Sequence, residues 1–226
     1  MTQKLAIFDV DGTLVDSRQI ITQAMAEAFE NEGLPPPDYH KTRQIVGLSI
    51  YEAIDRIAPR DIDSDSLERL VEGYKTAFVA RRRAGAVAEP LYNGIYDLLH
   101  ALKDAGWKLG MATGKSRKGV EAFLKKYDFA PLFDTSFCAD DGPGKPNAFM
   151  VLANLEALSI PAQRALMIGD TTFDMLMAKA AGVRDIGVNW GFHTEGELQS
   201  VDTSFIASSV QALSDIIFNF KPVSCL

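Results

Sequence analysis

The sequence has few cysteines and no long hydrophobic run. Cys138 and Cys225 are the two cysteines among 226 residues, and without a secretion signal we expect reduced thiols rather than a disulfide. No apolar run approaches the roughly 20 residues that a helix needs to cross a bilayer. The first apolar run, residues 4–8, meets Asp9 too early for a signal peptide. The sequence therefore predicts a cytoplasmic protein with no membrane partner.

Positive charge is scarce as well. The formal net charge of −7 argues against sequence-independent binding of nucleic acid, which requires a cationic face. Basic residues are concentrated only at Arg81, Arg82 and Arg83, and we interpret this run as a solvated stretch near a helix end. An acidic protein that binds an anionic substrate needs local positive charge at its site, so the cations of such a site must be identified one by one.

Short apolar runs alternate with amphipathic segments along most of the chain. The runs are typical of buried parallel strands and occupy residues 4–8, 108–112, 135–138, 165–168 and 185–188. The segments between them have helical spacing and occupy residues 95–105, 118–127, 148–158 and 173–181. Alternation of strand and helix implies right-handed crossovers, so we predict an α/β fold with a Rossmann-like parallel sheet.

The stretch between the first two strands breaks this alternation. Apolar residues from Ile20 to Phe29 and from Leu67 to Phe78 form two helical stripes, and Ser49 can cap a short helix between them. We therefore predict an inserted α-helical domain at residues 17–86, with residues 1–16 and 87–226 forming the core domain. An insertion joined to the core by two crossings, near Asp16 and near residues 87–89, can open and close as a lid.

The motif that follows the first strand carries the strongest indication of chemistry. It runs from Asp9 through Asp11, Gly12 and Thr13 to Ser17, and ligands in open α/β sheets bind beyond the carboxyl ends of the strands. Gly12 lets the chain turn close to a ligand, and an exposed Thr13 hydroxyl can donate a hydrogen bond. Two carboxylates this close repel each other unless a cation joins them or one holds a proton. Turn chemistry alone explains a lone Asp-Gly but not the entire run.

Three later segments end other strands and complement this motif. Thr113 and Gly114 begin a helix where a phosphate oxygen would be favoured, although the same sequence is an ordinary helix N-cap. Lys145 supplies a cation ahead of a helix, or is simply a surface lysine. Asp170 and Asp174 lie four residues apart at a helix entry, and N-capping by Asp170 would explain only one of them.

The chain carries four features in a fixed order: a DxDGT motif, a strand-end threonine, a lysine and a GDxxxD motif. This pattern resembles that of the haloacid dehalogenase superfamily. The resemblance covers the whole chain, and the helical insertion looks like the superfamily's C1-type cap. The chain is most similar to the branch that contains phosphoglycolate phosphatases and β-phosphoglucomutases. Dehalogenases lack the second aspartate, so the presence of Asp11 implies phosphate-ester chemistry.

The resemblance also implies roles for the residues that match the motifs. Asp9 would attack phosphorus to form an aspartyl-phosphate, and Asp11 would act as general acid and then as general base. Mg²⁺ would be bound by the Asp9 carboxylate, the Asp11 backbone carbonyl and Asp170, with Asp174 binding it directly or through water. The phosphoryl oxygens would be bound by Thr113, Gly114 and Lys145.

The helical insertion is expected to choose the substrate. Gly47 and Ser49 match a loop that closes over the leaving group in this branch, although a helix entry would select them for local reasons as well. Arg43 is the upstream cation nearest to this loop, and could reach a second anionic group of a substrate or be simply exposed. Mutases carry cations beside the corresponding Gly and Ser, whereas this chain has Val46 and Ile50.

The predicted function is hydrolysis of a small-molecule phosphate monoester, with phosphoglycolate as one candidate. A β-phosphoglucomutase-like phosphomutase is the alternative within the family. A phosphonate hydrolase would need a Schiff-base lysine, and the insertion has only Lys41 and Lys75, outside any recognisable motif. A non-catalytic module that binds a phosphorylated ligand is the alternative from another class.

Overall fold

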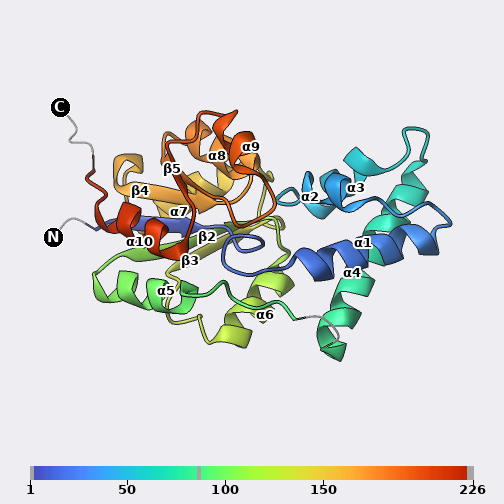
Figure 1. Ribbon diagram of the computed structural model, residues 1–226, viewed down its shortest axis with the longest axis horizontal. Helices are drawn as coiled ribbons and strands as arrows, with labels where there is room; N and C mark the ends of the chain where they lie inside the picture. Colours follow the sequence, from blue (N-terminus) through green and yellow to red (C-terminus); the bar gives the residue numbers. More distant parts are fainter. Residues whose placement is uncertain (1–2, 86–87, 223–226) are drawn as a thin grey trace.

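The computed structural model describes residues 3–85 and 88–222. In this part of the chain the core is a six-stranded, entirely parallel sheet with the strand order β3-β2-β1-β4-β5-β6 (Figure 1). The strands are β1 (Leu5–Phe8), β2 (Lys108–Thr113), β3 (Thr135–Cys138), β4 (Ala165–Gly169), β5 (Arg184–Val188) and β6 (Phe205–Ala207). The chain reverses its direction of winding between β1 and β4, the position where open α/β sheets bind ligands.

Helices cover both faces of the sheet. One face packs against α5 (Ile95–Asp104), α6 (Arg117–Tyr127) and α10 (Val210–Phe218), and the other against α7 (Phe149–Leu158) and α8 (Thr172–Ala180). Strand β1 alternates between the two layers, because Ala6 and Phe8 join the first apolar cluster while Leu5 and Ile7 join the second. Burial on both faces explains why the strands are continuously apolar. A 3₁₀ turn (Ala162–Arg164) and the short helix α9 (Glu195–Gln199) complete the core.

A helical cap, residues 18–84, lies beside the core (Figure 1). It consists of α1 (Arg18–Asn31), α2 (Tyr39–Arg43), α3 (Ile50–Ile57) and α4 (Ser64–Ala84). The predicted stripes of α1 and α4 face each other and enclose a separate apolar cluster that includes Met25, Phe29 and Leu70. Ser49 caps α3 as expected, since its hydroxyl accepts a hydrogen bond from the Glu52 amide at 3.5 Å. The cap therefore has its own hydrophobic core.

Most elements agree with the sequence-based expectations. The predicted α/β fold with a parallel sheet and a helical insertion is confirmed, and each expected strand and helix of the core occurs within a residue or two of its predicted bounds. The short elements α2, α9 and β6, and the helix α10, were not predicted. The exact domain division stays a prediction, and its second crossing includes residues 86–87, which lie outside the described residues.

Cys138 is a buried free thiol, and Cys225 lies outside the described residues. Among the helices of residues 3–85 and 88–222, none is long and apolar enough to cross a membrane.

Candidate active site

The site forms where three neighbouring strands end. Asp9 directly follows β1, Thr113 is the last residue of β2, and Asp170 directly follows β4. Strands β2 and β4 flank β1 on either side, so their carboxyl ends bring together side chains more than a hundred residues apart in the sequence. The backbone fixes this arrangement, because the Asp9 amide donates to the Ile168 carbonyl at 2.9 Å.

Lys145 forms a buried ion-pair bridge at the centre of the site. Its Nζ lies 2.8 Å from Oδ1 of Asp9 and 2.6 Å from Oδ1 of Asp174, and all three side chains are almost completely inaccessible to solvent. Burial lowers the pKa of the Lys145 ammonium, but attraction to Asp174 and Asp9 outweighs burial, so the pKa is raised overall. Lys145 is thus a charged group in contact with Asp9, and the alternative of a surface lysine is wrong.

Asp170 is held by donors from two separate segments. The Thr13 hydroxyl donates to Oδ1 of Asp170 at 2.8 Å, and the Phe192 amide donates to Oδ2 at 2.8 Å. Thr13 is therefore buried rather than exposed as expected. The carboxylate fits against Gly12 and Gly191, because a Cβ at either position would lie 2.3 Å from a side-chain atom of Asp170. Because both positions are glycine, the Asp170 carboxylate can lie this close to the backbone.

Asp174 stabilises the start of α8 as well as contacting Lys145. Its Oδ2 accepts hydrogen bonds from the Thr171 amide at 3.1 Å and the Thr171 hydroxyl at 2.7 Å. Thr171 is thus the N-cap and Asp174 its partner three residues later, a reciprocal capping box. The alternative in which Asp170 caps this helix is wrong.

The three buried carboxylates can hold a divalent cation. Asp9, Asp170 and Asp174 each offer a ligand oxygen, and these oxygens all lie within 4.8 Å of one another. Burial raises the pKa of Asp9 to about 6 despite the opposing charge of Lys145, and burial with repulsion from Asp9 and Asp174 raises the pKa of Asp170 well above its usual range. Oδ2 of Asp9 has no hydrogen-bond partner among the described residues. An all-oxygen set with excess negative charge and an unpartnered oxygen fits Mg²⁺.

A second chain of charges starts at Asp11. The Lys115 ammonium lies 2.8 Å from Oδ1 of Asp11 and 3.9 Å from Oε1 of Glu89, and the Arg82 guanidinium binds Glu89 through two hydrogen bonds of 2.8 and 3.0 Å. Sequence reasoning did not identify Lys115, Glu89 or Arg82 as part of the site. Arg81 and Arg82 are both half-buried and paired, Arg81 with Glu27 and Arg82 with Glu89, so the expectation of a solvated basic run is wrong for them. Arg83 is exposed as expected.

The cap contacts the loops that follow β2 and β4. Gly47 lies against Thr171, and a Cβ on Gly47 would lie 3.0 Å from the Thr171 hydroxyl oxygen. Gly114 lies against the same cap segment, because its missing side chain would meet the Gly47 and Leu48 carbonyl oxygens at 2.7 Å. Ser49 lies beside Gly144. The structure therefore brings Gly47, Ser49 and Gly114 to the edge of the site.

Two further predicted residues have different surroundings. Thr113 is fully buried, and its hydroxyl accepts a hydrogen bond from the Lys115 amide at 3.3 Å. Arg43 is held by the core domain. Its guanidinium donates to the Glu197 carboxylate at 2.8 and 2.9 Å and to the Phe192 carbonyl at 2.9 Å. A substrate contact of Arg43 stays a prediction. The alternative of a simply exposed arginine is wrong, because the Arg43 side chain is only 12% exposed and its contacts join the cap to the core.

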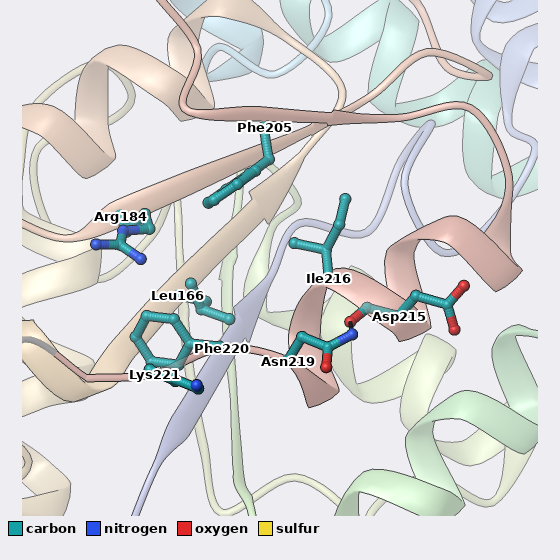
Figure 2. Close-up of a pocket in the computed structure, with 8 residues that line it drawn as sticks. All are labelled: Leu166, Arg184, Phe205, Asp215, Ile216, Asn219, Phe220 and Lys221. Carbon is teal, nitrogen blue, oxygen red and sulfur yellow. Dashed lines mark hydrogen bonds between the residues drawn. The ribbon is translucent and has the colours of Figure 1, made fainter.

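A pocket of about 410 Å³ lies elsewhere on the core (Figure 2). Arg184 and Phe205 line it where β5 and β6 begin, and Phe220 lines it beyond the end of α10. The pocket is therefore at the amino ends of the strands, whereas the carboxylates are at the carboxyl ends. Its lining includes Arg184, Asp215 and Lys221 but none of the carboxylates Asp9, Asp170 and Asp174.

Known proteins resemble this chain over most of its length. The family model for haloacid dehalogenase-like hydrolases matches residues 6–188. A protein of Dickeya dadantii named "Probable phosphatase IndB" is 32% identical, and the match covers 94% of this chain and 91% of that protein. A phosphoglycolate phosphatase of Caulobacter vibrioides is 31% identical over 89% of this chain and 85% of its own length.

Solved structures share the fold. A haloacid dehalogenase-like family hydrolase from Streptococcus pneumoniae is 26% identical, with a TM-score of 0.80 over 96% of this chain and 98% of that one. The family match spans the described site from Asp9 to Asp174. On these grounds the chain belongs to the haloacid dehalogenase-like hydrolase family.

Proposed function

We propose that this protein is a Mg²⁺-dependent phosphatase that hydrolyses small-molecule phosphate monoesters through an aspartyl-phosphate on Asp9. One observation carries the proposal: the buried Asp9 carboxylate has one oxygen paired with the Lys145 ammonium and the other without a partner among the described residues. A carboxylate in this position can attack phosphorus only if positive charge offsets its repulsion of the phosphate. Lys145 supplies part of that charge.

The proposed reaction has two steps. In the first, an oxygen of Asp9 forms a bond to phosphorus while the bond to the alcohol oxygen breaks, and Asp11 gives its proton to that oxygen. In the second, the Asp11 carboxylate takes a proton from water as the water oxygen bonds to phosphorus, and the Asp9 carboxylate leaves. Thr113, Gly114 and Lys145 would bind the phosphoryl oxygens through a hydroxyl, a backbone amide and an ammonium, respectively.

Mg²⁺ would be held by the Asp9 carboxylate, the Asp11 backbone carbonyl and Asp170, and would supply charge neutralisation for the transferring phosphoryl group. Oδ2 of Asp174 accepts two hydrogen bonds from Thr171, and Oδ1 faces the Lys145 ammonium, a positive charge that would repel a metal ion. Each oxygen of Asp170, in contrast, accepts a single hydrogen bond from a neutral donor. We therefore propose that Asp174 acts on the metal through water and through Lys145 rather than as a direct ligand.

Hydrolysis is favoured over phosphoryl transfer between sugar hydroxyls by the chemistry of the cap. A mutase must hold a second phosphate while shielding the intermediate. Val46 packs in an apolar cluster with Ile20, Ile21 and Phe192, and Ile50 packs in the core of the cap. Arg43 is already paired with Glu197. The names of the relatives, which include phosphoglycolate phosphatase, support a small phosphorylated acid as one substrate class.

The test is a screen of phosphate monoesters with Mg²⁺, measuring the release of free phosphate. Phosphoglycolate and β-glucose 1-phosphate are offered separately, the latter with a trace of glucose 1,6-bisphosphate. Free phosphate from at least one monoester is expected. Efficient formation of glucose 6-phosphate with little free phosphate would overturn the phosphatase proposal in favour of the mutase. Binding of phosphorylated ligands without turnover of any would support the non-catalytic module.

A further inference from the structure

Lys115 has no role in the reaction proposed above, although it is a charged residue buried beside Asp11. The side chain of Lys115 is only 6% exposed, and its ammonium lies 2.8 Å from Oδ1 of Asp11. Burying an ammonium is costly unless it is paired and held in good geometry. This lysine is therefore placed for interaction with Asp11 and not as a solvated surface charge.

Both ends of Lys115 are fixed. Its backbone amide donates to the Thr113 hydroxyl at 3.3 Å, and its carbonyl accepts from the Ala139 amide at 3.1 Å. Its ammonium lies 3.9 Å from Glu89 and 5.5 Å from the centroid of the Phe78 ring. The backbone contacts come from the core, whereas Phe78 belongs to helix α4 of the cap.

Glu89 is itself immobilised. Its carboxylate is bound by both Nε and one terminal nitrogen of Arg82, and its backbone carbonyl accepts from the Lys126 ammonium at 3.1 Å and from the Tyr127 hydroxyl. Arg82 also lies over the Phe78 ring, with its guanidinium carbon 4.8 Å from the ring centroid. Positive and negative charges alternate in space in the series Arg82, Glu89, Lys115 and Asp11, so each charged group has a neighbour of opposite charge.

The two oxygens of Asp11 differ in their surroundings. Oδ1 is buried and lies 2.8 Å from the Lys115 ammonium, whereas Oδ2 is not among the buried oxygens and accepts no hydrogen bond from the residues that the structure describes. The final torsion of an aspartate is broad, so a carboxyl group without an anchor samples many orientations. Anchoring of one oxygen removes this freedom and leaves the other available for proton exchange.

We propose that Lys115 is a positioning residue that acts through Asp11: by holding Oδ1 it orients the carboxyl group so that Oδ2 exchanges protons with the leaving and attacking oxygens. The inference rests on the proposed phosphatase function. Because Phe78 and Arg82 lie on α4, the support of Lys115 is complete only while the cap contacts the core.

The test is a double-mutant cycle between Lys115→Met and Asp11→Asn, with p-nitrophenyl phosphate and Mg²⁺ as the probe. Apart from the phosphate group itself, this probe carries no anionic group that a lysine could bind. Lys115→Met should lower kcat by about 10²-fold, the cost of a small misplacement of a reacting group, with KM nearly unchanged. In the Asp11→Asn background the same substitution should have almost no further effect, because its target is already gone.

Matched variants separate positioning from folding. Lys118→Met removes an exposed lysine three residues away and should leave kcat unchanged. Lys115→Arg keeps the charge and should recover part of the activity. If Lys115→Met fails to fold, Glu89→Gln replaces it in the cycle, and should lower kcat in the same direction with the same dependence on Asp11.

Three results would overturn the inference. The first is a normal kcat in folded Lys115→Met. The second is a loss of kcat on Lys115→Met that is just as large in the Asp11→Asn background. The third is a raised KM with a normal kcat, which would indicate that Lys115 contacts the substrate directly. Wild-type protein that turns over no phosphate monoester would instead overturn the proposed function and this inference together. Wild-type turnover that disappears in Asp9→Asn keeps the function even if the Lys115 inference fails.

Discussion

Replacement of Lys145 by Met removes the charge between two buried carboxylates while keeping most of the side-chain volume. Lys145 Nζ lies 2.8 Å from Asp9 and 2.6 Å from Asp174, and each such pair is worth about 4 kcal/mol or more before desolvation is subtracted. Loss of one partner of a buried ion pair typically costs about 3–5 kcal/mol of unfolding free energy. We therefore expect a destabilisation of about 3 kcal/mol in Lys145→Met, since protonation of a carboxylate relieves part of the repulsion.

The same substitution should also remove stabilisation of the transferring phosphoryl group. Loss of one preorganised donor typically costs about 10²-fold or more in kcat. The assay is kcat at a temperature well below the melting transition, together with urea unfolding of wild type and variant. Lys125→Met, which removes an exposed lysine from α6, is the control. Near-normal turnover in a folded but destabilised Lys145→Met would refute the catalytic role and leave a purely structural lysine.

Three further predictions follow from contacts at the edge of the site. Gly114→Ala should lower kcat/KM, because the new Cβ would lie 2.7 Å from the Gly47 and Leu48 carbonyl oxygens and push the cap away; unchanged kcat/KM would show that this contact is dispensable. EDTA should abolish turnover, and added Mg²⁺ should restore it. Asp170→Ala should weaken the affinity for Mg²⁺ in calorimetric titrations. Full activity in metal-free buffer would contradict a metal-dependent reaction. The hydrogen bonds from Arg43 lower the pKa of Glu197 from 4.5 to about 2, so their stabilisation is fully present above pH 4.5 and is lost as the pH falls towards 2. An ion pair worth about 1 kcal/mol corresponds to a Tm shift of about 2–4 °C, so Glu197→Gln should lower Tm by this amount at pH 7 in thermal melts. The difference in Tm between wild type and variant should shrink below pH 4.5. A difference that stays constant with pH would contradict the lowered pKa of Glu197.

The core elements were predictable because local pattern and tertiary environment agree. Strands such as β1 and β4 are apolar throughout, since both faces are buried, and each ends abruptly at Asp9 or at Asp170. Strand β6 was missed because it has only three residues, of which Phe205 is exposed, and a short run of this kind has no clear period. Helix α2 has five residues, too few for a helical stripe.

The proximity of Asp9 and Asp170 could be predicted from strand ends, because parallel strands bring their carboxyl ends to one edge. Lys145 lies in the loop between β3 and α7, and its place at the site was implied only by the family resemblance. The pairing of Lys115 with Asp11 could not be derived in this way. It depends on the rotamer of a lysine in a helix-entry loop and on Glu89, which follows the cap. Sequence spacing also could not reveal that Arg43 pairs with Glu197, since the contact joins residues 154 positions apart.

Asp9→Asn tests the central claim most directly, because the amide keeps the shape of the side chain but cannot attack phosphorus. Its turnover of the best phosphate monoester is compared with wild type, and circular dichroism and thermal melting verify the fold. The account predicts a folded protein without measurable release of phosphate. Activity within about tenfold of wild type, in a well-folded Asp9→Asn protein, would contradict the assignment of Asp9 as the nucleophile.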